Sequence, residues 1–286
     1  MRCIRESTRL SDPQLDVYYP PTASALSTPN GKVPVLFFIY GGGYNTGARR
    51  FPEPYDLGYR ALAAFFARHG FLTVIPDYRL VPEVQFPAAS EDIRDALVWV
   101  AGHAAEVGGA SGELDPGYVL LLGHSAGAAH ALVLHLYPPL RASLEGQDVG
   151  LRIRGLVLSG SPWYFGVRGE SVVSTSPVKF YFGGAEEQKE REPAGLWKAL
   201  GDEEVCAFPD VLLIQAEREL GWLDGTREVM EREIREKFDK VGRKLDKTYI
   251  AKGHNHVSVN WGLSTGDERA EKWGVDIVAW IMARLN

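Results

Sequence analysis

Residues 119–130 read VLLLGHSAGAAH, and this stretch decides the fold. The branched apolar run at 119–122 predicts a buried strand, and the alanine- and leucine-rich residues after Gly127 predict a helix. Glycines two positions before and two after Ser125 permit a sharp turn where neighbouring backbone passes close by. The Ser125 hydroxyl would then lie at a helix N-terminus, where free N–H groups stabilise developing negative charge. The stretch therefore predicts an exposed serine nucleophile.

The motif G-x-S-x-G is short, and in a chain of this composition it arises by chance on the order of 0.2 times. An ordinary strand-to-helix turn is the alternative interpretation. The apolar strand before the motif and the helix after it are the context that favours the nucleophile.

Composition excludes several classes of function. The chain has 286 residues, 45% of them hydrophobic, which suits a single domain over 1–286 with a sizeable core. Its net charge of -6 comes from 37 acidic and 31 basic residues without long runs, so no nucleic-acid or polybasic membrane surface is indicated. The two cysteines, Cys3 and Cys206, lack a partner motif and predict neither a disulfide framework nor a cysteine metal site.

No segment approaches the ~20 apolar residues that span a bilayer, and the first residues lack the apolar core of a signal peptide. We therefore expect an intracellular, cytoplasmic protein whose partner is a small-molecule substrate.

Seven apolar runs predict the strands of the fold, and segments with helical periodicity separate them. The run at 15–19 ends in two prolines, as an edge strand would. Near-continuous apolar strands that alternate with helices predict a mostly parallel sheet covered by helices on both faces. The strands are expected at 15–19, 35–40, 71–75, 119–122, 153–159, 211–216 and 248–251, and helices at 55–69, 90–106 and 268–285.

The segment 162–208 interrupts this alternation. It carries two groups of three aromatic residues (163–165 and 180–182), the charged stretch AEEQKERE and a short helical pattern near 196–200. Connections in α/β units are usually about 2–6 residues long, so a segment of this length predicts a lid or cap over the site. A peripheral helical excursion is the alternative.

A serine hydroxyl needs a base within hydrogen-bond reach, and the base needs a group to orient it. Candidate bases follow the last predicted strand at His254 and His256, and the spacing from Gly253 favours His256. Because each candidate follows a strand, all would meet at one edge of the sheet. Two histidines at i and i+2 without a nearby third ligand do not build a metal site, and no cofactor is expected. The candidate acids follow strand 211–216 and are Glu217, Glu219 and Asp224.

From about residue 15 to the C-terminus the chain resembles an α/β-hydrolase of the hormone-sensitive-lipase-like esterase group, with kynurenine formamidase as a near relative. The motifs that carry the resemblance are YGGGY (40–44), DYRL (77–80), FPAASEDIRDALVWV (86–100), GHSAGA (123–128), LLIQAEREL (212–220) and GHNHVS (253–258). Together they are far more specific than G-x-S-x-G alone, and they imply an α/β-hydrolase fold.

The resemblance implies Ser125 as the nucleophile, His256 as the base and Glu219 as the acid, with Asp224 as the alternative acid. It further implies an oxyanion hole formed by the backbone N–H groups of Gly42, Gly43 and Ala126. Two positions depart from the family pattern. Tyr40 stands where the glycine loop usually begins with histidine, and Glu219 stands where the acid is usually aspartate.

The expected function is hydrolysis of a carboxylic ester of a small to medium, partly aromatic substrate through an acyl-enzyme on Ser125. Aromatic residues Tyr44, Trp163 and Tyr164 suggest an apolar substrate pocket, and the core of the lid is the alternative place for them. An arylformamidase-like amide hydrolase, or a biosynthetic enzyme that reuses the triad for condensation or elimination, is an alternative. A non-catalytic ligand-binding protein is another. The apolar face of the final helix fits packing on the sheet or a homodimer contact equally well.

Overall fold

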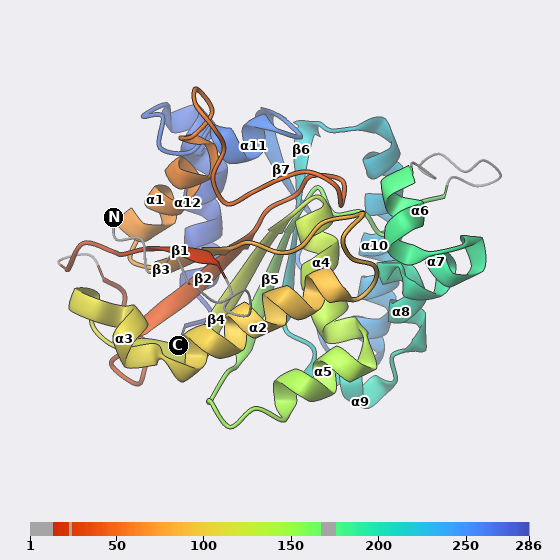
Figure 1. Ribbon diagram of the computed structural model, residues 1–286, viewed down its shortest axis with the longest axis horizontal. Helices are drawn as coiled ribbons and strands as arrows, with labels where there is room; N and C mark the ends of the chain where they lie inside the picture. Colours follow the sequence, from red (N-terminus) through yellow and green to blue (C-terminus); the bar gives the residue numbers. More distant parts are fainter. Residues whose placement is uncertain (1–13, 23–24, 167–175, 286) are drawn as a thin grey trace.

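The computed structural model describes residues 14–22, 25–166 and 176–285. Within them, seven strands form one sheet in the order β1-β3-β2-β4-β5-β6-β7 (Figure 1). β1 pairs antiparallel with β3, and the remaining pairs are parallel. The predicted mostly parallel sheet with an edge strand at its N-terminal end is therefore confirmed.

Each predicted strand corresponds to one observed strand. The strands are β1 (Leu15–Tyr18), β2 (Val33–Ile39), β3 (Leu72–Pro76), β4 (Leu114–His124), β5 (Ile153–Ser159), β6 (Asp210–Arg218) and β7 (Tyr249–Asn255). The helices before the insertion are α1 (Gly58–Arg68), α2 (Ala88–Gly102), α3 (Ala104–Gly108), α4 (Ala126–Leu136) and α5 (Pro138–Glu145). Those after it are α10 (Gly221–Lys240), α11 (Ser258–Trp261) and α12 (Glu268–Met282).

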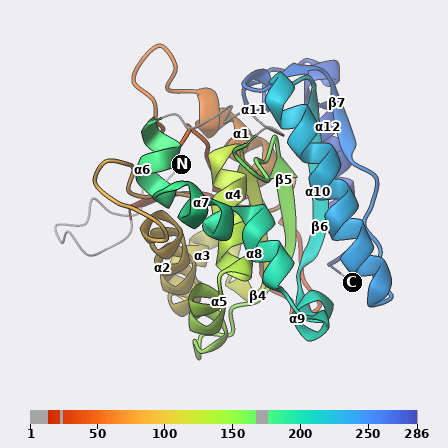
Figure 2. The same ribbon diagram turned by 90° about the vertical axis from the view of Figure 1, so that its right-hand side faces the viewer.

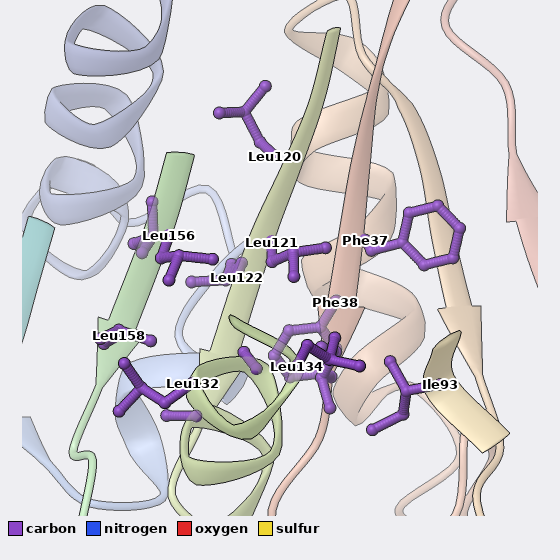
Figure 3. Packing of buried hydrophobic residues seen from close by; sticks show 14 of the residues in the cluster. Phe37, Phe38, Ile93, Leu120, Leu121, Leu122, Leu132, Leu134, Leu156 and Leu158 are labelled. Atoms are coloured by element: carbon purple, nitrogen blue, oxygen red, sulfur yellow. The ribbon is translucent and has the colours of Figure 1, made fainter. Parts of the chain in front are cut away.

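Helices cover both faces of the sheet (Figure 1). α2 and α5 pack against α4 on one face, while α1 contacts α12 on the other. The hydrophobic core lies between these layers, and the strands are apolar on both sides because both sides are covered. Figure 3 shows leucines of β4 and β5 beside Leu132 and Leu134 of α4 and Ile93 of α2. This packing fixes the carboxyl ends of the strands, where the candidate residues lie.

The insertion at 162–208 contains four helices in its described part. They are α6 (Ser176–Phe182), α7 (Ala185–Arg191), α8 (Pro193–Ala199) and α9 (Asp202–Ala207). Figure 2 shows them as a chain of short helices along the side of the molecule, with α8 against α4 and α9 near the end of α10. Residues 167–175 of the predicted lid lie outside the described residues, as does Cys3.

The predicted helix 90–106 differs from the observed one. α2 starts at Ala88 and ends at Gly102, and a separate short helix, α3, follows from Ala104. No helix in the described ranges is long and apolar enough to cross a membrane.

Candidate active site

Ser125 lies in the turn between β4 and α4, as the motif predicts. Its backbone has φ 54° and ψ −124°, a conformation that residues with a side chain rarely adopt. The Ser125 N–H donates to the Ser159 carbonyl of β5 at 2.9 Å. The turn is therefore held from the neighbouring strand, with the serine immediately before the N-terminus of α4.

The two glycines of the motif are required by close backbone contacts. A Cβ at Gly123 would lie 2.5 Å from Ala128 Cα, and one at Gly127 would lie 2.2 Å from the Ile39 carbonyl oxygen. No side chain fits at either position without moving backbone. The spacing of G-x-S-x-G thus reflects the packing of α4 against β4 and β2.

The structure brings together one acid and one histidine. His256 follows β7, and its Nδ1 lies 2.6 Å from Oε1 of Glu219, which follows β6. The Glu219 side chain is only 1% exposed, and its Oε1 also accepts the backbone N–H of Leu220 at 2.9 Å. A nearly buried carboxylate at this distance can orient an imidazole and stabilise its charged form.

The alternative acids have other partners. Asp224 Oδ1 accepts from the Gln215 side-chain amide at 2.9 Å. Glu217 accepts from the Gly253 N–H at 2.8 Å and pairs with Lys252, and these contacts lower the pKa of its carboxyl group. Both carboxylates therefore support the surrounding loops and do not orient His256.

The alternative base, His254, is buried away from Glu219. One of its ring nitrogens contacts the Ala270 carbonyl at 3.0 Å and the other contacts the Ser258 hydroxyl at 3.3 Å. These contacts connect β7 to α11 and α12.

Gly160, directly after β5, is a site residue that the sequence reasoning did not identify. It has φ 54°, and a Cβ there would lie 3.0 Å from Glu219 Oε2 and 3.0 Å from His256 Nδ1. The backbone at Gly160 thus forms the surface on which the acid and the base rest. The only signal in the sequence is a glycine at the end of an apolar strand.

The glycine loop that follows β2 packs directly on the nucleophile turn. A Cβ at Gly41 would lie 2.7 Å from Ser125 Cβ, so only glycine allows this approach. The Gly42 carbonyl accepts the Thr46 N–H at 3.0 Å, which closes the loop on itself. The N–H groups of Gly42 and Gly43 donate to no other residue in the described part of the chain.

Tyr40 anchors this loop in the place where histidine is usual. Its hydroxyl donates to Asp77 Oδ1 at 3.0 Å, and its ring stacks on Tyr78, with 4.6 Å between ring centroids. Asp77 also accepts the backbone N–H of Arg49 at 2.8 Å. One carboxylate therefore holds both ends of the loop.

The edge strand reinforces the same loop. Asp16 of β1, only 1% exposed, accepts from Arg49 Nε at 3.3 Å and from Arg50 Nε at 2.7 Å. Because buried carboxylates are costly unless they are paired, these arginines and Asp16 fix one another.

The aromatic residues expected in a substrate pocket are placed differently. Trp163 has no exposed surface, and its indole N–H donates to Glu233 Oε2 at 2.8 Å. Tyr44 is 3% exposed and stacks on Tyr181 of α6. These two side chains are core residues that join the insertion to the sheet, so the expectation that they line a pocket does not fit the structure. Tyr164 is half-buried.

The chain has the α/β-hydrolase fold, as shown by the sheet order, the helices on both faces and the sharp turn at Ser125 after a central strand. The family model BD-FAE matches residues 15–146. Esterase B from Lactobacillus rhamnosis has the same fold, with a TM-score of 0.70, 19% identity, and coverage of 95% of this chain and 81% of that one.

Curated relatives match over shorter segments. Carboxylesterase NlhH from Mycobacterium tuberculosis is 32% identical over 125 residues, which are 44% of this chain and 34% of that protein. The non-reducing polyketide synthase atr1 from Stereocaulon alpinum is 32% identical over 119 residues, which are 41% of this chain and 4% of that protein. The match thus spans about a third of NlhH and a small part of the synthase.

Proposed function

We propose that this protein hydrolyses carboxylic esters through an acyl-enzyme on Ser125. The observation that carries the proposal is the contact of 2.6 Å between Glu219 Oε1 and His256 Nδ1. Both groups follow strands that lie on the same side of β4 as β5. A Cβ at Gly160, which follows β5, would lie 3.0 Å from each of them. The similarity to carboxylesterase NlhH supports the same chemistry.

In the proposed reaction, Ser125 Oγ attacks the ester carbonyl while His256 Nε2 takes the hydroxyl proton. The tetrahedral intermediate collapses, the C–O bond to the alcohol breaks, and His256 returns the proton to the leaving alkoxide. Water then attacks the acyl-enzyme while His256 takes its proton, and His256 returns this proton to Ser125 Oγ as the carboxylic acid product leaves. Glu219 stabilises the imidazolium in both halves and stays ionised.

The oxyanion would bind to backbone N–H groups of Gly42, Gly43 and Ala126. The first two have no other acceptor among the described residues, and Ala126 begins α4, where the helix dipole favours negative charge. Each such donor contributes ~3 kcal/mol to the stability of the transition state.

The side chains beside the acid and the base favour an apolar acyl or alcohol group of small to medium size. Leu220, next to Glu219, is 46% exposed, and Val257, next to His256, is 50% exposed. Esterase B from Lactobacillus rhamnosis was solved with a C4-C4 tributyrin phosphonate, a compound with chains of this size.

A biosynthetic role for the same site is the second candidate, and the similarity to a segment of a polyketide synthase favours it over the others. An arylformamidase-like activity would use the same groups on an amide. The acid–base pair argues against a non-catalytic binding protein. A panel of p-nitrophenyl acetate, p-nitrophenyl butyrate and formanilide separates ester from amide hydrolysis, and turnover of none of them would favour a specialised biosynthetic substrate.

The decisive experiment combines labelling by a fluorophosphonate with turnover of p-nitrophenyl butyrate. Wild type should label and turn over, while Ser125→Ala and His256→Ala should do neither. Glu219→Gln should lower kcat by up to about 10⁴-fold, because loss of the orienting acid in a catalytic triad lowers kcat by that order.

Glu217→Gln is the matched control, since it removes a carboxylate two residues earlier whose partners are Lys252 and Gly253. It should leave kcat near that of wild type. A wild-type protein that neither labels nor turns over any ester would contradict the proposal, and equal losses in both glutamate variants would contradict the role of Glu219.

A further inference from the structure

We propose that His124 is a positioning residue that holds the base His256 in place through the His256 backbone carbonyl. This inference rests on the proposed hydrolase function and adds a residue to it. His124 precedes Ser125 at the end of β4, so a single turn would carry the nucleophile and the group that places its base.

The contact between the two histidines is direct. His124 Nε2 lies 2.8 Å from the His256 carbonyl oxygen, and the two ring centroids are 4.6 Å apart. Because a carbonyl oxygen only accepts hydrogen bonds, Nε2 is the nitrogen that carries the proton. The His124 side chain thus donates to the backbone of the residue whose imidazole moves the protons.

His124 is neutral when the site works. Burial, with a smaller contribution from the nearby His256 ring, lowers the pKa of its imidazole to about 3, although the hydrogen bond to the His256 carbonyl acts in the opposite direction. A neutral ring at this distance does not repel the imidazolium that forms on His256, whereas a charged one would. His124 can therefore fix the position of the base without opposing its protonation.

The other nitrogen of His124 faces the glycine loop. Nδ1 is buried and has no hydrogen-bond partner among the described residues, and a Cβ at Gly41 would lie 3.2 Å from it. The ring thus fills the space between the glycine loop and the segment that carries His256. A change of size at position 124 would disturb both.

The segment around His256 is also shaped by local hydrogen bonds. β7 ends at Asn255, whose Oδ1 accepts the N–H groups of Val257 and Ser258 at 3.0 and 2.8 Å. Asn255 shapes the turn from within, while His124 connects it to the strand that carries Ser125. Removal of the second connection would let the base shift relative to the nucleophile.

Two substitutions separate the hydrogen bond from the packing. His124→Leu fills the same space with an apolar side chain and removes the N–H that donates to the His256 carbonyl. His124→Gln keeps a side-chain N–H that can reach this carbonyl. We expect His124→Leu to lower kcat by about 10–100-fold with little change in KM, because a misplacement of ~1 Å has costs of that order. His124→Gln should recover most of the loss.

The downfield proton NMR resonance of His256 Nδ1–H reports the geometry of the acid–base pair. It should be sharp in wild type and in His124→Gln, and broadened or shifted in His124→Leu. His130→Leu is the matched control, because His130 is an equally buried histidine whose polar contact is Ser90 and not His256. It should lower the melting temperature but leave the resonance and kcat in place.

The positioning role is overturned if His124→Leu retains the wild-type kcat and resonance. It is also overturned if His124→Leu and His130→Leu both lose activity in proportion to their loss of stability, because the loss would then come from destabilisation alone. Fluorophosphonate labelling distinguishes this failure from the larger one. If wild type is labelled and His124→Leu has the kcat and resonance of wild type, the positioning role alone is overturned. If wild type is not labelled, the proposed function is overturned and this inference with it.

Discussion

At the scale of single residues, the site depends on glycines, which have no side chain, as much as on the residues that carry chemical groups. Gly41 lets the glycine loop touch Ser125, and Gly160 lets the acid and base rest on the end of β5. At Gly160 the positive φ adds a second constraint, because residues with a Cβ are strained there.

We expect Gly160→Ala to damage activity more than stability. The new methyl group would lie 3.0 Å from both Glu219 Oε2 and His256 Nδ1, so the pair must shift by a few tenths of an ångström or more. The predicted loss is ~100-fold in kcat, with an unfolding free energy lowered by about 1–3 kcal/mol from backbone strain.

Steady-state kinetics and urea denaturation of the same preparation check this prediction. Gly242→Ala is the control, since Gly242 also has a positive φ of 75° but nothing within 4 Å of its Cβ position. It should lower stability and leave kcat unchanged. Equal kcat losses in both variants would show that strain alone, and not contact with the pair, is responsible.

The sequence predicted the residues with chemical groups better than the residues that support them. Strand ends and motif spacing indicate Ser125 and His256 as candidates, and the resemblance to hormone-sensitive-lipase-like esterases implies Glu219 among the three acids that follow β6. The support from His124 and Asp77 depends on side-chain contacts between segments far apart in the chain. Such contacts leave no periodic pattern in a single sequence.

At the scale of elements, the insertion is held to the body by side chains that bind carbonyl groups. Lys237 of α10 donates to the carbonyls of Trp197 and Leu200 at 2.7 Å each. These carbonyls belong to the end of α8, where intrahelical partners are lacking. The charged side chain therefore joins the end of α8 to α10.

Lys237→Met should lower the unfolding free energy by about 1–3 kcal/mol, because the substitution leaves two carbonyl groups without their charged donor. Lys240 lies on the same helix as Lys237 and forms an exposed ion pair with Asp202 of α9. Lys240→Met removes this pair and should change the unfolding free energy by about 0.5 kcal/mol or less. Urea denaturation of both variants compares them. Equal effects would mean that Lys237 acts only as a surface charge.

Strands were predicted more completely than helices. Strands β2 to β6 each contain a mostly apolar run buried on both faces, which a single sequence displays directly, whereas β7 at the edge of the sheet is largely exposed. α10 has a mostly polar surface with a few buried positions such as Met230, Ile234 and Phe238, so its stripe is narrow. The helices of the insertion are six or seven residues long, which is too short for a periodic signal.

At the scale of the whole molecule, three histidines whose pKa is lowered in the folded chain make stability depend on pH. Burial lowers the pKa of His124 to about 3, of His130 to about 3 and of His135 to about 4, with Arg141 contributing at His135. The unfolded chain binds protons at these side chains near pH 6.5, while the folded chain does not. Their contribution to stability is thus present above about pH 6.5 and is lost as the pH falls towards 4.

We expect the unfolding free energy to fall with decreasing pH by up to about 4 kcal/mol per pH unit near pH 5, the value for three protons. Urea denaturation between pH 4.5 and pH 7 would measure the slope. His135→Phe should reduce it by about 1.4 kcal/mol per pH unit. His103→Phe, at an exposed position, should leave it unchanged, and an unaltered slope in His135→Phe would contradict the prediction.

The ion pairs of Asp16 extend the influence of the site to the edge of the sheet. Among the strands of the described residues, β1, which carries Asp16, pairs with β3 alone, yet it holds the arginines that end the glycine loop. For protein engineering, this makes β1 a poor attachment point. A fusion, tag or deletion that loosens β1 would disturb the glycine loop that we propose to bind the substrate oxygen, even though the change lies far along the chain from His256.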